Sequence, residues 1–307
     1  AKEILGVFET AMSVLRVELG VETASNMISA FVDLFVSNTR EDRSGVGGQG
    51  RSSSVADELI GALMTGSTTG TMLILTLINF LRVVVEEPKK SFHALHESIY
   101  NLMFGTLVPV IFSGPSVVFV DLELSVHRFC RSCLTNHLRT FVVKDGASFR
   151  WVSEGKKNVF TTIFQILAQS FVRVNQPPES FQFNLDTLES FNTTHRLYSH
   201  PVFRSFRARE FCLNIVNVLC SGTHDLLSSH ITKTLYGIAL ADYEYFRVQI
   251  LPPLLNEMAG LGVKDAEITS LLESFCADGN QPDLFTFNSN MANFISIRRR
   301  CLPGRSS

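Results

Sequence analysis

The sequence predicts an all-α fold in which HEAT-like antiparallel helix pairs stack into an α-solenoid, as part of a right-handed superhelix. The first observation is the stretch 185–255, where apolar runs at helical spacing follow one another with only short turns between them. The second is that about a dozen such runs occur along the chain, in pairs of roughly 40–50 residues, the length of a HEAT repeat. Helices with short loops that cannot bury their apolar faces alone must stack on their neighbours. An irregular helical bundle would give a similar pattern and stays open as the alternative.

Helical periodicity and turn residues place the helices along the chain. The expected ranges are 4–20, 21–37, 68–85, 91–112, 122–143, 158–174, 180–198, 201–220, 226–239, 242–260, 264–276 and 289–300. The most regular period lies in 158–174, where Phe160 and Phe164 fall on the inward face. Pro178 is expected in the first turn of its helix, and Pro252 with the proline after it is expected to kink or restart the helix that contains them.

We expect residues 1–307 to form one helical repeat region, interrupted by a flexible loop at 38–54. Apart from glycines, this loop contains one apolar residue, Val46, so it cannot bury enough surface to offset the entropy of ordering it. The glycines before Arg51 follow the spacing of a phosphate-binding loop, but arginine replaces the lysine and no strand precedes them. A flexible Gly/Ser loop is therefore the interpretation we favour for this segment.

The composition excludes several classes of protein. The net charge is −2 with both signs dispersed, which argues against a nucleic-acid partner. Six cysteines without a regular framework indicate the reduced thiols of a nuclear or cytosolic protein. The most apolar run, 72–81, is shorter than the ~20 residues that a membrane span needs, so we expect no membrane insertion. No secretory signal opens the chain. Since the chain does not begin with Met, we expect it to be a piece of a longer protein.

One helix carries side chains with the character of metal ligands. His127, Cys130, Cys133 and His137 fall on one helix face. They extend over about 15 Å of helix, however, and four such ligands cannot surround a zinc ion with bonds of only ~2.0–2.3 Å. We interpret the two thiols as buried residues that line a seam between helices. The sequence therefore predicts no metal site, no cofactor site and no catalytic residue.

Other polar motifs are given structural interpretations. His224 and Asp225 are adjacent and diverge on a helix, so they predict no catalytic pair; instead Ser221 or Thr223 is expected to cap the helix that begins near Asp225. Four further histidines are expected on ordinary polar surface: His93, His96, His195 and His200. Asn192 begins a glycosylation acceptor motif, which we interpret as a chance match.

Two groups of arginines stand out. Arg204, Arg207 and Arg209 are expected in the first turns of their helix, where the helix dipole disfavours cations, and this makes them candidates for contact with an acidic protein partner. Ordinary solvated surface is nevertheless the interpretation that the sequence favours for these three residues. The run 298–300 is expected at a helix C-terminus, where cations are favoured and need no partner.

Several segments of the chain resemble a known family. The segment 188–198 reads LESFNTTHRLY, the segment 223–227 reads THDLL, and the segment 241–246 reads ADYEYF. Together they resemble the C-terminal repeats of the exportin six family, which are importin-β-type nuclear export receptors for actin and profilin–actin. Looser similarity extends to 92–110 and 290–304. The resemblance carries over no cargo-contact residue.

This resemblance implies a C-terminal repeat region of a larger receptor, which exports actin or profilin–actin in a RanGTP-dependent manner. It also implies nuclear pore proteins as partners and shuttling between nucleus and cytoplasm. A HEAT-repeat scaffold or adaptor outside transport is the alternative. An enzyme would need convergent polar residues in a cleft, and the sequence indicates none.

Overall fold

The computed structural model describes residues 68–87, 90–113, 120–145, 148–173, 176–276 and 281–301. The chain divides into two compact units, one made of Ala1–Val143 with Arg150–Ile163 and the other of Lys144–Phe149 with Phe164–Ser307. The expected helices at 4–20 and 21–37, the loop at 38–54 and the phosphate-loop-like segment lie outside the described residues.

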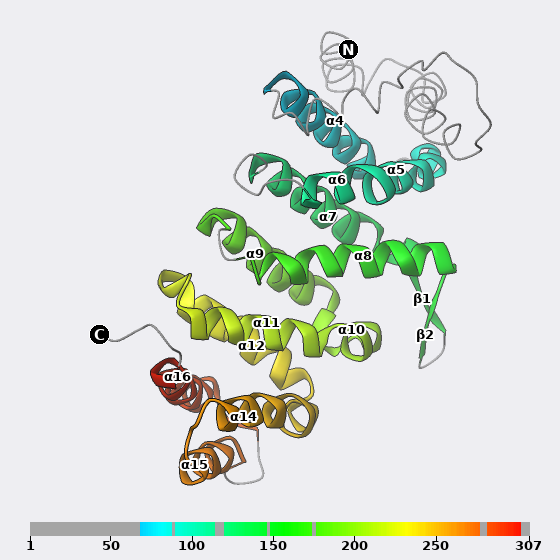
Figure 1. The fold of residues 1–307 in the computed structure, drawn as a ribbon. Coiled ribbons are helices and arrows are strands. Elements are labelled where there is room, and N and C mark those ends of the chain that lie inside the picture. The colour runs from blue at the N-terminus through cyan, green and yellow to red at the C-terminus, as the bar shows by residue number, and fades with distance from the viewer. Residues whose placement is uncertain are drawn as a thin grey trace, which may run out of the picture. The chain divides into compact units, whose positions relative to one another are not determined.

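The described residues form helices joined by short connections, apart from one hairpin (Figure 1). In the first unit these are α4 (Thr68–Glu86), η2 (Lys90–Leu95), α5 (His96–Leu102), η3 (Met103–Leu107), α6 (Val108–Ser113) and α7 (Val120–Phe141). The strands β1 (Val142–Asp145) and β2 (Ser148–Trp151) follow, and α8 (Glu154–Ser170) continues into the second unit. The predicted all-α class is confirmed, while the handedness of a superhelix stays a prediction.

The second unit continues the same pattern of short helices. Its elements are α9 (Pro178–His195), η4 (Leu197–Ser199), α10 (Pro201–Phe206), α11 (Ala208–Ser221), η5 (Asp225–Leu227), α12 (Ser228–Ala241), α13 (Tyr243–Tyr245), η6 (Phe246–Ile250), α14 (Leu251–Gly260), α15 (Asp265–Cys276) and α16 (Leu284–Cys301). Among these helices, α11 packs on α12, and α16 packs on α11, α12 and α15. Among the described residues, no helix has both the length and the hydropathy needed to cross a membrane.

The hairpin corrects one predicted boundary. The sequence pattern predicts that the helix over 122–143 continues until it is closed after Val143, but α7 ends at Phe141 and β1 begins at once. Val142 and Val143 are β-branched, which favours an extended backbone. The N–H of Val152 donates to the carbonyl of Phe141 at 3.0 Å and so ties the end of the hairpin back to the helix.

Several predicted helices are divided in the structure. The range 91–112 contains a 3₁₀ turn, α5, a π turn and α6 rather than one α-helix. The range 201–220 breaks at Arg207, whose φ of −134° is not helical. The predicted restart at Pro252 is confirmed, because the π turn η6 ends at Ile250 and α14 begins immediately after it. The last helix begins at Leu284, five residues before the range expected for it.

Phenylalanine rings join neighbouring helices in the second unit. The ring of Phe164 on α8 lies 5.7 Å from that of Phe203 on α10 and 6.2 Å from that of Phe211 on α11, measured between ring centroids. Both contacts are edge-to-face, and all three side chains are buried. Such contacts add ~0.5–1.5 kcal/mol per pair beyond the burial of apolar area. The inward position predicted for Phe164 is therefore confirmed.

Helix α9 ends in a defined local structure. Pro178 lies in its first turn, as predicted, and Arg196 ends it in the left-handed conformation with φ of 52°. The side-chain Oδ1 of Asn192 accepts a hydrogen bond from the N–H of Tyr198 at 3.0 Å. This turn directs the buried Tyr198 ring towards α12, where a Cβ added to Gly237 would lie only 3.0 Å from Tyr198 Cε2.

We predict that Gly237→Val lowers the free energy of unfolding by about 1–3 kcal/mol, because the buried Tyr198 ring must move to admit the new side chain. Urea unfolding of the 307-residue chain measures this change. Gly260→Val is the matched control, since nothing lies within 4 Å of a Cβ added at that helix end. Equal destabilisation by the two variants would contradict this packing.

Candidate functional site

The three arginines predicted to face a partner have different surroundings in the structure. Because α10 ends at Phe206, Arg204 lies in a last helical turn, where the helix dipole favours a cation. The prediction that all three occupy first turns is therefore wrong, and the reason is the break at Arg207. Only Arg209 lies inside the first turn of α11.

Two of these arginines are engaged within the second unit. Arg204 pairs with Asp242, which also accepts a hydrogen bond from the N–H of Tyr245 and so caps the next helix. Arg207 pairs with Glu210 on its own helix. Arg209 is exposed, and within the described residues it has no ion pair. Of the three arginines, Arg209 is therefore the one whose charge remains free for a partner.

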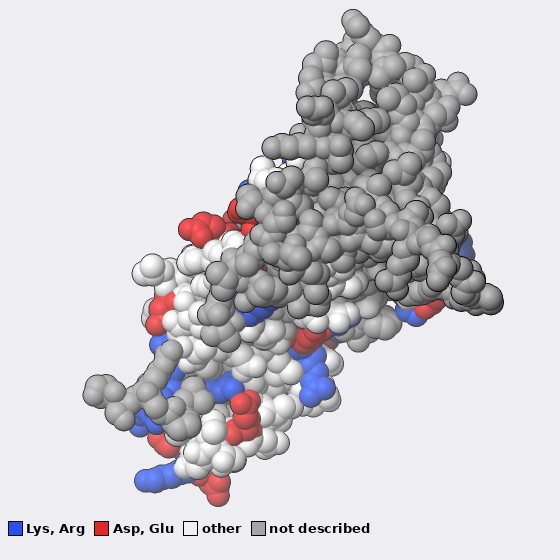
Figure 2. Space-filling view, turned by 45° about the horizontal axis from the view of Figure 1, so that its top comes forward, with Lys and Arg blue, Asp and Glu red and all other residues white. Residues whose placement is uncertain are grey.

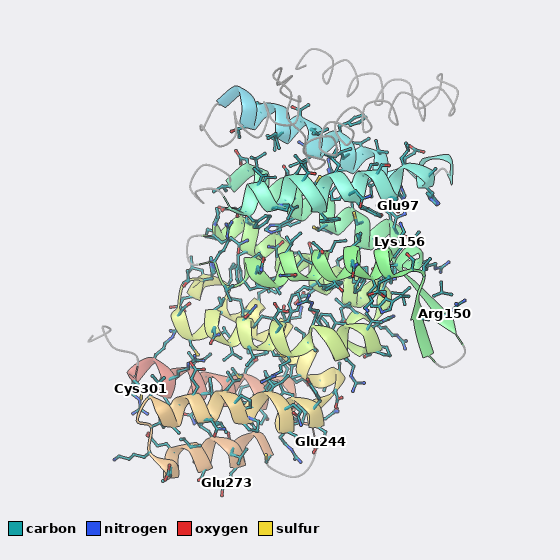
Figure 3. The ribbon with its side chains drawn as sticks, turned by 45° about the vertical axis from the view of Figure 1, so that its right-hand side comes forward. Glu97, Arg150, Lys156, Glu244, Glu273 and Cys301 are labelled. Atoms are coloured by element: carbon teal, nitrogen blue, oxygen red, sulfur yellow. The ribbon has the colours of Figure 1, made fainter. Side chains whose placement is uncertain are left out.

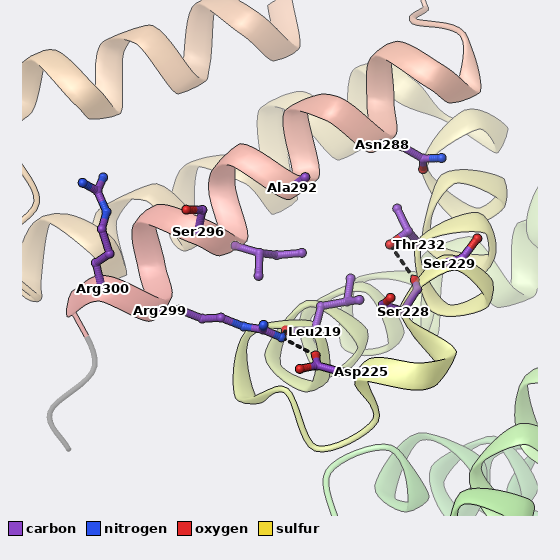
Figure 4. A pocket seen from close by; sticks show the side chains of 11 residues that line it. Leu219, Asp225, Ser228, Ser229, Thr232, Asn288, Ala292, Ser296, Arg299 and Arg300 are labelled. Carbon is purple, nitrogen blue, oxygen red and sulfur yellow. Dashed lines mark hydrogen bonds and ion pairs between the residues drawn. The ribbon is translucent and has the colours of Figure 1, made fainter. Parts of the chain in front are cut away.

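A groove lies between α12 and α16 (Figure 4). Its volume is about 820 Å³. The α11–α12 side contributes Leu219, Asp225, Ser228, Ser229 and Thr232, and α16 contributes Asn288, Ala292, Ile295, Ser296, Arg299 and Arg300. The hydroxyl of Thr232 donates to the carbonyl of Ser228 at 2.8 Å. The lining therefore combines apolar, hydroxyl-bearing and charged side chains.

The arginines at the end of α16 contact the helices that lie beside this groove. The Arg299 guanidinium donates to the carbonyls of Leu219 and Cys220 at 2.6 and 3.2 Å and to Asp225 Oδ1 at 2.6 Å. It therefore satisfies carbonyls at the end of α11 that have no partner within that helix. Figure 4 shows Arg299 reaching across the groove to Asp225.

The two flanking arginines contact other helices. Arg298 is buried and donates to Glu257 Oε1 at 2.6 Å and to Asn217 Oδ1 at 3.0 Å, while the exposed Arg300 pairs with Glu267 at 3.0 Å. All of these contacts lie within the chain, so they do not test the expectation that the run needs no binding partner. The sequence does place the three residues correctly at a helix C-terminus, but it does not show which helices lie beside that end.

The turn before α12 also differs from the prediction. The N-cap of α12 is Leu227, and no side chain caps this helix or the short turn η5. The Ser221 hydroxyl instead donates to the carbonyl of Val218 at 2.9 Å, so it serves the end of α11. His224 is buried and stacks on the ring of Phe181, with 4.2 Å between centroids.

The histidines and cysteines of α7 lie in the first unit. Cys130 and Cys133 are buried, as predicted for thiols in a helix seam, and burial raises the pKa of both. His127 is also buried, and burial lowers its pKa to about 4. Within the described ranges, no group of three or more His, Cys, Asp or Glu residues could hold a metal ion.

His96 is buried, with 1% of its surface exposed, so the prediction of polar surface is wrong for this residue. Its ring centroid lies 4.3 Å from that of His137 and 5.1 Å from that of His93. Burial, followed by the charges of His137, His93 and Lys156, lowers the pKa of His96 to about 3. His96 is the first residue of α5, and its ring lies against that of His137 near the end of α7.

Lys156 on α8 lies near the cluster of His93, His96 and His137. Its ammonium nitrogen lies 4.8 Å from the centroid of the Tyr100 ring, and the pKa of Lys156 is lowered by burial while Glu97 acts in the opposite direction. Figure 3 shows Glu97 and Lys156 close to each other on neighbouring helices. These shifted groups do not line the groove, and their shifts arise mainly from burial. Burial in a structural network accounts for them without a catalytic cleft.

Charges of both signs are interspersed on the described part of the surface seen in Figure 2. No large patch of a single sign is visible there, which agrees with the dispersed charges of the sequence.

We predict that the chain loses stability as the pH falls from about 6.5 to 4. The folded-state pKa values of His96 and His127 are about 3 and 4, below the ordinary value near 6.5, so the unfolded chain binds more protons in this interval. Each histidine then lowers the free energy of unfolding by up to about 1.4 kcal/mol for each pH unit of acidification in this interval. Urea midpoints measured between pH 7.5 and 4.5 give this slope. The variants His96→Gln and His127→Gln should make it shallower, and an unchanged slope in the double variant would contradict the assignment.

We predict that Arg299→Ala lowers the free energy of unfolding by about 1–3 kcal/mol, because carbonyls at the end of α11 lose a charged donor. Arg300→Ala, which breaks one exposed ion pair, should cost less than about 0.5 kcal/mol. Urea unfolding of the two variants compares them directly. If Arg300→Ala were the more destabilising, this account of the α16 end would be wrong.

Comparison with known proteins assigns the chain to a family. The sequence model described as "Exportin-6, C-terminal TPR repeats" matches residues 120–301, more than half of the chain. Exportin-6 of Danio rerio is 29% identical over 305 residues, which cover 97% of this chain and 25% of the relative. Exportin-6 of Homo sapiens is 28% identical over 306 residues, covering 97% of this chain and 25% of the relative.

A more distant relative covers nearly the same part of the chain. Exportin-6 of Dictyostelium discoideum is 26% identical over 299 residues, covering 95% of this chain and 24% of the relative. The chain thus spans about a quarter of the length of the curated relatives that it matches. No solved structure matches it. The match over residues 120–301, where the structure describes successive helices, shows that the chain belongs to the exportin-6 family of nuclear export receptors, in the region of their C-terminal repeats.

Proposed function

We propose that this chain supplies the C-terminal repeats of a nuclear export receptor that carries actin, as profilin–actin, in a RanGTP-dependent manner. The observation that carries the proposal is the family match over residues 120–301 together with the helical repeats found there. RanGTP and profilin–actin are assigned to the full-length receptor, because this chain corresponds to a quarter of its relatives.

The physical mechanism is positive coupling between two ligands. A receptor that binds cargo more tightly when RanGTP is bound must also bind RanGTP more tightly when cargo is bound. The ternary complex then forms in the nucleus, and GTP hydrolysis in the cytoplasm releases the cargo. The receptor contacts nuclear pore proteins during transit and shuttles between nucleus and cytoplasm. No step requires nucleic acid, membrane insertion or catalysis by the receptor.

Within the second unit, three exposed side chains support a role in protein contact. Arg209 is a cation without an ion pair in the described structure, at a helix start where cations are disfavoured. Leu226 is fully exposed next to the groove residue Asp225, and Phe285 is 82% exposed at the start of α16. A charge in an unfavourable position and large exposed apolar groups are features that a protein partner would cover.

The proposal is tested by pull-down of profilin–actin with the full-length receptor, in the presence of Ran loaded with a non-hydrolysable GTP analogue or with GDP. We expect cargo capture with the GTP form and little capture with the GDP form. Capture that is equal in the two conditions would exclude this mechanism and favour a scaffold that binds constitutively. Absence of capture in both conditions would exclude profilin–actin as the cargo.

We predict that Arg209→Glu in the full-length receptor weakens the RanGTP-dependent capture of profilin–actin by roughly three- to tenfold, because reversing a charge towards an acidic surface costs on the order of 1 kcal/mol. The melting temperature should not fall, since Arg209 is exposed and a carboxylate is favoured in the first turn of a helix. Arg139→Glu, at another exposed arginine in the first unit, is the matched control and should leave capture unchanged. Equal capture by wild type and Arg209→Glu would remove Arg209 from the contact surface.

A further inference from the structure

Two helices of the chain contain the same departure from α-helical geometry. In the first unit, the π turn η3 occupies Met103–Leu107, and in the second unit the π turn η6 occupies Phe246–Ile250. At the end of each turn, a backbone N–H donates five residues back, from Val108 to the carbonyl of Met103 and from Leu251 to that of Phe246. An α-helix would place these hydrogen bonds four residues back.

Several positions of the two helices correspond at one constant separation in the sequence. Met103 and Phe246, which begin the two π turns, are 143 positions apart, and at the same separation Tyr100 corresponds to Tyr243. All four side chains are buried. The proline in the first turn after the π turn, Pro109 or Pro252, also has this separation. The similarity thus covers the aromatic anchor, the π turn and the proline.

The surroundings of the two tyrosines are also similar. Burial, and after it the Cys133 thiol on α7, raises the pKa of Tyr100. The Tyr243 hydroxyl donates to the carbonyl of Phe275 on α15 at 2.8 Å, next to Cys276, and the pKa of Tyr243 is raised to about 12 by burial and by that thiol. Cys133 and Cys276 have the same separation of 143 positions. In each unit, the tyrosine is therefore buried at the start of its helix and near a cysteine of a following helix, and the Tyr243 hydroxyl also donates to that helix.

Proline explains why each helix adopts a π turn at this point. Proline has no N–H, so Pro109 cannot donate to the carbonyl of Gly105, and Pro252 cannot donate to that of Val248. A π turn accommodates the lost bond by moving the neighbouring donor to a carbonyl one residue further back. Gly105 and Val248 both lie on the exposed side of their helix, and nothing lies within 4 Å of a Cβ added at Gly105. Each π turn therefore has an open outer side and a packed inner side.

We propose that η3 and η6 are matched hinges, one in each unit, at which the tyrosine-anchored start of the helix and the segment after the proline move relative to each other. Bending at the π turn changes the direction of the helix on its open outer side, while the buried contacts before and after the turn are kept. The tyrosine, the π turn and the proline recur together. We therefore expect the hydrogen bonds of the two π turns to open locally in the same way. The proposal does not depend on which cargo the receptor carries.

Hydrogen–deuterium exchange of the 307-residue chain, followed by mass spectrometry of peptides over the two π turns, tests this proposal. In the wild type, amides of 103–108 and 246–251 should exchange at least about tenfold faster than buried amides of the flanking α-helices, because local opening exposes them. Gly105→Ala has room for its new methyl group and should slow exchange at η3 by removing backbone freedom.

Proline replacement provides the second test. Pro109→Ala and Pro252→Ala restore an N–H donor, permit continuous α bonding and should each slow exchange in the adjacent π turn only. Pro178→Ala, at a helix start without a π turn, is the matched control and should leave both π turns unchanged. Exchange in the wild type that is no faster in the π turns than in the flanking helices would overturn the proposal, even if a proline variant failed to fold. Fast exchange at only one of the two turns would overturn their equivalence.

Discussion

The burial of one helix face by the next helix is the constraint on which both units depend. None of the described helices could keep its apolar side in water, and short connections give each helix only its neighbours as cover. In the second unit, Phe164 meets Phe203 and Phe211 from two following helices. In the same unit, Gly237 admits the Tyr198 ring so closely that α12 and the turn after α9 determine each other's position.

Helices whose apolar residues recur with the helical period could be predicted from the sequence, because that period is a local property of the chain. Phe164 and Pro178 lie where they are expected. The hairpin after Phe141 could not be predicted from helical period alone, since the two valines that follow fit either a helix end or a strand. The π turns were also missed, because the sequence shows only that Pro109 and Pro252 interrupt a helix and does not show how the helix compensates.

The candidate site was harder to predict because partners from distant segments define it. Arg299 lies at the helix C-terminus expected from its sequence, yet its role follows from Leu219, Cys220 and Asp225, some 74–80 residues away in the chain. His96 has a polar side chain but is buried, and its ring packs against that of His137 on another helix. Residue type thus indicates what a side chain can do, while the neighbouring helices decide what it does.

Within the second unit, these contacts form a packed framework that carries exposed groups such as Arg209. The most direct test of this framework is a double-mutant cycle in urea unfolding for Phe164→Leu and Phe211→Leu, which lie on α8 and α11 and meet edge-to-face. The account predicts a coupling free energy of about 0.5–1.5 kcal/mol between the two substitutions. Strict additivity would show that the two helices do not support each other through these rings and would contradict the account.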